Sequence, residues 1–154
     1  MIFTLVDTSV LCELLEVPGK SQQAAVVQAE FAARVQRGEQ FLLPATTLIE
    51  TGNHIAQVKV GDRRAAAERY VRFVEKAAGG EPPWTVTEVT WDEELLLQLI
   101  AGDSTGQSFV DLAGNGLLGG GDVAILVESD ILRRRAGSRA VQVWTLEKTL
   151  AGLA

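Results

Sequence analysis

Residues 2–9 read Ile-Phe-Thr-Leu-Val-Asp-Thr-Ser, a short apolar run that ends in an acid and two hydroxyl side chains. The nearly continuous apolar character of residues 2–6 is typical of a parallel strand that is buried on both faces. A helical pattern follows from residue 10 to about residue 16, where Pro18 and Gly19 stop it. A strand that leads directly into a helix begins a βαβ unit, so this segment predicts a parallel sheet.

The rest of the chain repeats this alternation of strands and helices. We expect further strands at residues 41–43, 84–89 and 141–144, and helices at residues 21–37, 46–60, 62–77, 90–100, 122–135 and 145–153. Thr46 or Thr47 is expected to cap the helix after the second strand, and Thr90 and Glu93 to form a capping box. Residues 102–121 carry seven glycines and are expected to form a loop with one helical turn at 109–112. The predicted fold is an α/β, three-layer α/β/α sandwich with a short parallel sheet, in a single domain spanning residues 1–154.

Composition limits the kind of site that the chain can build. With 154 residues and 47% hydrophobic content, it is long enough to bury a core, and no apolar run approaches the length of a membrane span. One cysteine and one histidine exclude a structural Cys/His zinc site and a zinc site with two histidines. A bound metal would therefore need oxygen ligands, which favours magnesium or manganese.

The net charge of −6 restricts how the protein could act on nucleic acid. Proteins that hold nucleic acid only by neutralising its phosphates are basic, whereas an acidic protein needs divalent cations between its carboxylates and the phosphates. The single cysteine, Cys12, leaves no internal disulfide, and no basic region precedes the apolar start of the chain. We therefore expect a cytoplasmic protein without a signal peptide.

Four acids stand where a predicted strand passes into a helix or where a helix begins: Asp7, Glu50, Asp122 and Glu147. In an open parallel sheet, ligands bind beyond the carboxyl ends of the strands, so these side chains are expected to converge. Each acid also has a plainer interpretation. Asp7 and Asp122 are plausible helix caps, Glu50 completes a capping box with Thr47, and Glu147 suits the positive end of a helix.

The ordered set of motifs around these acids resembles the PIN-domain family. Residues 3–11, Phe-Thr-Leu-Val-Asp-Thr-Ser-Val-Leu, are similar to the opening of PIN domains, and residues 43–50, Leu-Pro-Ala-Thr-Thr-Leu-Ile-Glu, are similar to their second motif. Residues 122–125, Asp-Val-Ala-Ile, and residues 144–147, Trp-Thr-Leu-Glu, resemble the third and fourth motifs. The motifs occur in the family's order and cover nearly the whole chain.

This resemblance implies a metal-dependent endoribonuclease that hydrolyses RNA phosphodiesters with magnesium or manganese. Asp7, Glu50 and Asp122 would be the core metal ligands, with Glu147 as a fourth acid. Ser9, Asn53 and Thr145 would support them. Small members of the family include the toxin halves of bacterial toxin–antitoxin pairs, so the expected partners are single-stranded or structured RNA, an antitoxin protein and a second copy of the chain, with no membrane.

The sequence departs from the family pattern at three points. The fourth acid is usually Asp and is Glu147 here, and Asp122 follows Gly119-Gly120-Gly121 where an aromatic or polar residue is more usual. The interval between Asp122 and Glu147 is also longer than in most members. The alternative hypothesis is therefore a catalytically degenerate PIN-like module that binds a protein partner or RNA without cleavage.

Other motifs favour different functions less well. Residues 114–119 spell G-x-G-x-x-G, but no clear strand precedes them, as a dinucleotide site requires. A phosphoacceptor domain would need an acidic neighbour beside Asp7, and a phosphatase of the haloacid-dehalogenase type would need an acid where Ser9 stands.

Several further side chains are expected to be structural. His54 lies four residues after Glu50 on the same helix face, within reach of the site, but the favoured interpretation is a solvated or packed residue. Trp84, Trp91 and Trp144 are interpreted as core or interface residues. RNA contacts are the less favoured interpretation of two basic stretches that also suit solvated helix faces: Arg63, Arg64, Arg69, Arg72 and Lys76, and Arg133, Arg134, Arg135 and Arg139.

Overall fold

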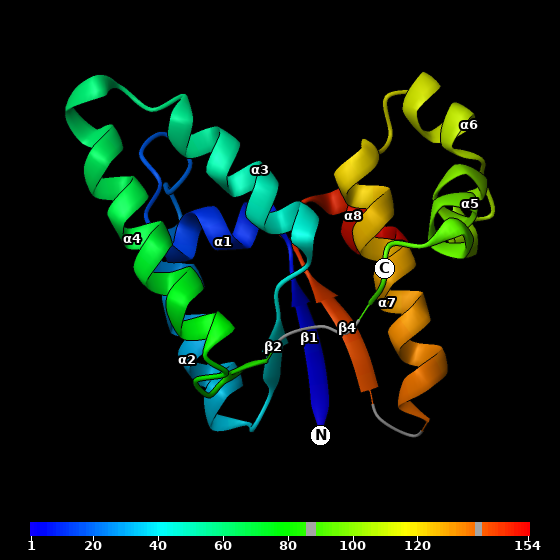
Figure 1. The fold of residues 1–154 in the computed structure, drawn as a ribbon, viewed down its shortest axis with the longest axis horizontal. Helices are drawn as coiled ribbons and strands as arrows, with labels where there is room; N and C mark the ends of the chain where they lie inside the picture. Colours follow the sequence, from blue (N-terminus) through cyan, green and yellow to red (C-terminus); the bar gives the residue numbers. More distant parts are fainter. Residues whose placement is uncertain (86–88, 138–139) are drawn as a thin grey trace.

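The computed structural model describes residues 1–85, 89–137 and 140–154. Within these ranges the chain alternates strands and helices (Figure 1). The strands are β1 (Ile2–Val6), β2 (Gln40–Leu42), β3 (Trp84–Thr85) and β4 (Ala140–Trp144). The helices are α1 (Thr8–Leu14), α2 (Ala24–Gln36), α3 (Ala45–Ala56), α4 (Val60–Ala78), α5 (Glu93–Ala101), the 3-10 turn η1 (Asp103–Thr105), α6 (Phe109–Gly114), α7 (Gly120–Ala136) and α8 (Lys148–Leu153).

The described strands form one sheet in the order β3-β2-β1-β4, and every neighbouring pair is parallel. Strand β1 lies at the centre, where Leu5 pairs with Leu42 of β2 and Val6 with Trp144 of β4. Parallel pairing places the carboxyl ends of these strands at the same edge of the sheet. The residues that follow β1, β2 and β4 are therefore brought together.

Helices cover both faces of the sheet, which confirms the predicted three-layer α/β/α sandwich. Because side chains alternate along a strand, Val6 and Phe41 point into one hydrophobic cluster while Leu5 and Leu42 point into another. The first cluster contains buried apolar residues of α1 to α4, and the second buried apolar residues of α5 to α8. Figure 1 shows the two groups of helices on opposite sides of the strands.

Element ends differ from the sequence prediction where capping depends on tertiary contacts. Helix α3 has Pro44 as its N-cap, and the Thr47 hydroxyl donates to the Val6 carbonyl at 2.7 Å instead of capping the helix. Helix α5 is capped by Asp92, whose carboxylate accepts from the Leu95 amide, so the box expected from Thr90 is wrong.

Other helices and strands begin or end at residues that differ from the sequence prediction. Helix α8 begins at Lys148, three residues later than expected. The expected loop at 102–121 contains η1, α6 and the first residues of α7. Residues 86–88 of the expected third strand lie outside the described residues.

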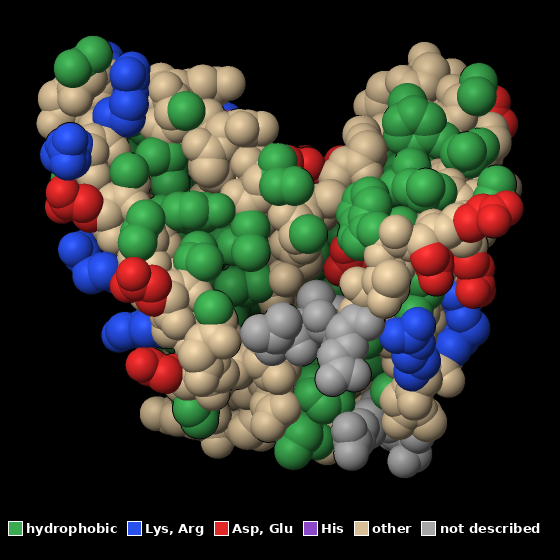
Figure 2. Space-filling view, in the orientation of Figure 1, with side chains coloured by type: hydrophobic (Ala, Val, Ile, Leu, Met, Phe, Trp, Pro, Cys, Tyr) green, Lys and Arg blue, Asp and Glu red, His purple; other side chains and the backbone are tan. Residues whose placement is uncertain are grey.

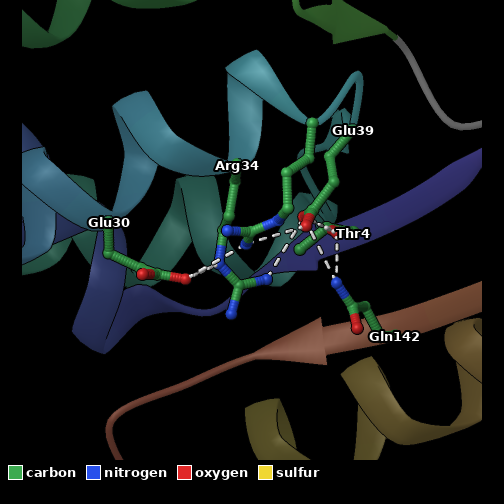
Figure 3. A network of polar contacts seen from close by, with 6 residues as sticks. Thr4, Glu30, Arg34, Glu39 and Gln142 are labelled. Atoms are coloured by element: carbon green, nitrogen blue, oxygen red, sulfur yellow. Dashed lines mark hydrogen bonds and ion pairs between the residues drawn. The ribbon is translucent and has the colours of Figure 1, made fainter.

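A buried polar network joins α2 to three segments of the sheet (Figure 3). The Glu39 side chain is only 3% exposed, and its Oε2 accepts from Thr4, Gln142 and Arg34 at 2.9, 3.2 and 3.2 Å. Arg34 also lies over the Trp144 ring, 4.6 Å from its centroid. The network therefore links α2 with β1, β4 and the start of β2.

The three tryptophans differ in their surroundings. Trp144 is buried in the first hydrophobic cluster, and the partly buried Trp84 packs against that cluster, as expected for core residues. Trp91 is 45% exposed, and its indole nitrogen donates to Glu128 at 3.2 Å. In the part of the chain that the structure describes, none of the helices combines the length and apolar character that crossing a membrane requires.

Candidate functional site

A cleft of about 400 Å³ opens at the carboxyl edge of the sheet. Its walls come from α1, α3, the start of α7 and the segment between β4 and α8. Figure 2 shows the molecule hollowed between the arm that carries α3 and α4 and the arm that carries α6 and α7, with acidic side chains at the bottom of the hollow. The carboxylates that line the cleft are Asp7, Glu13, Glu50, Asp122 and Glu147.

Asp7 occupies the N-cap position of α1, but its side chain makes no capping hydrogen bond. Its Oδ2 instead accepts from the hydroxyls of Ser9 and Thr145, each at 2.8 Å. The carboxylate is only 5% exposed, so the two hydroxyls compensate part of the cost of burying it. The Asp7 side chain therefore does not act as a helix cap. Its contacts with the two hydroxyls orient the carboxylate in the cleft.

The two hydroxyls beside Asp7 are themselves held in place. The Ser9 and Thr145 hydroxyl oxygens lie 3.3 Å apart, and each accepts a backbone amide at 3.0 Å, from Leu146 and Glu147 respectively. These contacts join the first turn of α1 to the segment that follows β4. The orientation of Asp7 therefore depends on two segments that are more than 130 residues apart in the chain.

Glu50 reaches the cleft from α3. Its Oε2 accepts from the Thr8 hydroxyl at 2.9 Å, and Thr8 is the first residue of α1. The capping-box interpretation required a partnership with Thr47, whose hydroxyl is bonded to Val6 instead. Glu50 is thus tied to the helix that begins directly after Asp7.

Asp122 lies in the first turn of α7, where its Oδ2 accepts from the Gly119 amide at 3.2 Å. Asp122 therefore caps α7, as expected, and also lines the cleft. Burial raises the pKa of Asp122, and the negative charges of Asp7, Glu50 and Glu147 raise it further, while the Gly119 amide acts in the opposite direction. Asp122 is thus close enough to be affected by three other carboxylates, which come from distant parts of the chain.

Glu147 is exposed at the edge of the cleft. It occupies the N-cap position of α8 and makes no side-chain capping bond there. Its charge contributes to the raised pKa of Asp122, although it is the last and smallest of the contributions. The longer Glu side chain therefore reaches the same cleft as the other three acids.

The cleft contains residues that the sequence patterns did not predict. Glu13 is buried on α1 and accepts from the Gln23 amide at 3.0 Å. Its spacing of four residues from Ser9 places both on one helix face, which was the available signal. Lys20 and His54 also line the cleft, whereas the expected supporting residue Asn53 is exposed on α3 and lies outside the lining.

The lone cysteine is not a candidate nucleophile. Burial raises the pKa of the Cys12 thiol to about 11. The thiol therefore stays protonated at neutral pH, and the protonated form is a poor nucleophile. The chemistry of the cleft rests on its carboxylates.

The donor set of the cleft is made of oxygen atoms, which suits a hard divalent cation such as magnesium or manganese. As the side chains stand, no group of three or more His, Cys, Asp or Glu residues among those the structure describes is arranged to hold a metal ion. Oxygen atoms of Asp7, Glu50 and Asp122 are instead engaged by Ser9 and Thr145, by Thr8 and by the Gly119 amide.

Comparison of this chain with protein-family models, with curated proteins and with solved structures finds no match. The chemistry of the cleft and the sequence motifs that supply its acids are therefore the indications of function.

Proposed function

We propose that the protein is a divalent-cation-dependent endoribonuclease of the PIN-domain type. The observation that carries the proposal is the convergence of Asp7, Glu50, Asp122 and Glu147 on one cleft, where burial, and to a smaller extent the charges of the other three acids, raise the pKa of Asp122. Such a cluster costs free energy unless cations neutralise it. A site that keeps several carboxylates together despite this unfavourable free energy is a candidate for binding a cation and the phosphate that the cation attracts.

The residues of the cleft have separate tasks in this proposal. Asp7, Glu50 and Asp122 would hold magnesium or manganese, which when bound supplies charge neutralisation at the phosphate and an activated water. Ser9 and Thr145 fix the direction of the Asp7 carboxylate, and Thr8 fixes that of Glu50.

Hydrolysis adds the oxygen of water to phosphorus and breaks the bond to the leaving sugar oxygen, which takes up a proton. Glu147 lies at the exposed edge of the cleft, where substrate enters. Lys20 lies on the same cleft and carries a positive charge suited to a flanking phosphate of the RNA.

A second candidate function is that of a PIN-like module that binds a protein partner without cutting RNA. Apolar side chains of α5 and α6 favour it, because they are exposed to between 48% and 75%: Leu96, Leu97, Ile100 and Val110. Figure 2 shows hydrophobic side chains gathered on the arm that carries these helices. Such a surface suits a second copy of the chain or an antitoxin protein.

Cleavage of a fluorescently labelled single-stranded RNA distinguishes the two functions. The wild-type protein is expected to cut in the presence of manganese, and Asp7→Asn to lose at least about a hundredfold in rate because the neutral amide is a poorer cation ligand. Asp111→Asn is the matched control, since Asp111 is an exposed acid of α6 outside the cleft. Equal rates for wild type and Asp7→Asn would exclude the proposed active site.

A further inference from the structure

A glycine of α7 lies directly against the carboxylate of Glu50. A Cβ atom on Gly121 would lie 1.7 Å from Glu50 Oε1 and 2.7 Å from Glu50 Cδ. Real Cβ atoms do not approach other heavy atoms closer than 3.0 Å. Any other residue at position 121 would therefore displace the Glu50 carboxylate.

The opposite side of the same carboxylate is held by α1. Glu50 Oε2 accepts from the Thr8 hydroxyl at 2.9 Å, while Oε1 lies over the backbone of Gly121. Glu50 itself belongs to α3, so three helices meet at one carboxylate. The Thr8 hydroxyl holds the Glu50 carboxylate on one side, and the missing side chain of Gly121 leaves space for it on the other.

The neighbouring glycines do not share this role. A Cβ atom on Gly119 or on Gly120 would meet no heavy atom within 4 Å. Gly121 is also not required by the backbone, because its φ lies outside the left-handed region that favours glycine. Glycine lowers the stability of a helix relative to alanine, so the reason for Gly121 is space.

We propose that Gly121 is a positioning residue: its missing side chain lets the Glu50 carboxylate lie beside Asp122, and this spacing sets the affinity of the cleft for a divalent cation. The inference rests on the proposed function, because it concerns the same acids. It also accounts for the glycine directly before Asp122, the last of the three glycines that set this chain apart from the PIN-domain pattern.

The test compares Gly121→Ala with Gly120→Ala, two identical changes one residue apart in the first turn of α7. Both variants are expected to fold with similar melting temperatures, because the atoms that the methyl group added at position 121 would displace are the end of a flexible side chain. Calorimetric titration with manganese is expected to show at least about tenfold weaker binding for Gly121→Ala and a change of less than about twofold for Gly120→Ala. Equal affinities in the two variants would overturn the proposal.

A shorter acid at position 50 provides a rescue. In the Gly121→Ala background, Glu50→Asp withdraws the carboxylate by one methylene and is expected to restore part of the manganese affinity, although Glu50→Asp alone weakens binding. A merely structural effect of Gly121→Ala would not produce this reversal of sign. Additive losses in the double variant would contradict the positioning role.

A measurement without metal separates this inference from the proposed function. The ¹³C resonance of the Glu50 carboxyl is expected to move in metal-free Gly121→Ala and to stay unchanged in Gly120→Ala. If the wild type binds no manganese but the resonance moves as expected, the proposed function fails and the positioning of Glu50 by Gly121 stands. An unchanged resonance in Gly121→Ala would refute the positioning itself.

Discussion

At the scale of single residues, the orientation of Asp7 depends on two hydroxyls. Removal of one of them by Thr145→Ala is expected to weaken manganese binding by about tenfold, because groups that orient metal ligands typically contribute roughly 10–100-fold to affinity. Thr145→Ser keeps the hydroxyl that donates to Asp7 and is expected to bind manganese nearly as well as the wild type. Calorimetry on both variants checks this, and equal losses in the two would show that the hydroxyl is not responsible.

Glu128 is a second residue whose ionisation has a measurable consequence. It is 1% exposed in the middle of α7, and among the described residues its Oε2 has no hydrogen-bond partner. Burial raises the pKa of Glu128 to about 6, although the Trp91 N–H that donates to it favours the charged form. The folded protein therefore binds this proton more tightly than the unfolded chain does.

A carboxyl with a raised pKa contributes most to stability when it is protonated. Its contribution is complete below the usual pKa of 4.5 and is lost as the pH rises through about 6. Glu128→Gln is therefore expected to raise the free energy of unfolding by about 2 kcal/mol at pH 8 and to leave it unchanged at pH 4. Urea denaturation at both pH values measures these free energies. If Glu128→Gln changed the free energy of unfolding equally at pH 4 and pH 8, the ionised Glu128 carboxylate would not be the cause.

At the scale of elements, the polar network around Glu39 holds α2 against the sheet. Arg34→Met would remove the guanidinium from a carboxylate whose side chain is 3% exposed. The expected loss in the free energy of unfolding is about 3 kcal/mol, in the range for breaking a buried ion pair. Arg37 reaches the other oxygen of Glu39 at 3.2 Å, so the loss should fall at the low end of that range.

The second change in this network tests the cause of the loss. Adding Glu39→Gln to Arg34→Met removes the buried negative charge that Arg34 had helped to neutralise and is expected to recover part of the stability, because the amide can still bond with Thr4 and Gln142. Urea denaturation of the four proteins of this cycle measures the coupling. Strictly additive losses would show that Arg34 acts through its other contacts, the Trp144 ring and the ion pair with Glu30 at 2.8 Å.

The sequence predicted strands and helices well where the spacing of apolar residues determines which side chains are buried. The apolar run at residues 2–6 became β1, and the periodic segments became α2, α4 and α7 with shifts of a few residues at their ends. Capping was predicted less well, because Thr47 bonds to the Val6 carbonyl of another element. A side chain that has a partner elsewhere in the fold does not cap its own helix.

The candidate site was predictable to the extent that topology alone determines it. Asp7, Glu50 and Glu147 were expected at this edge because they follow predicted strands, and Asp122 because it opens a helix within the third of the four motifs. The bond from Thr8 to Glu50, the burial of Glu13 and the space beside Gly121 depend on how α1, α3 and α7 pack against one another. No spacing within one segment reveals a contact between side chains of different segments.

At the scale of the whole molecule, the negative charge of the chain and the acidic side chains of its cleft both indicate that a cation is needed for RNA to bind. The protein carries 20 acidic and 14 basic side chains, and five of those acids line the cleft at the carboxyl edge of the sheet. RNA, which is itself an anion, would be repelled from such a cleft. A divalent cation between the carboxylates and a phosphate removes this repulsion and links the fold to the proposed reaction.

Calorimetric titration with manganese shows whether this cleft binds a divalent cation through Asp7. We expect saturable binding to the wild-type protein and to Asp111→Asn, and no detectable binding to a folded Asp7→Asn variant. A folded wild-type protein that binds no manganese, or an Asp7→Asn variant that binds it as tightly as the wild type, would refute a cation site centred on Asp7.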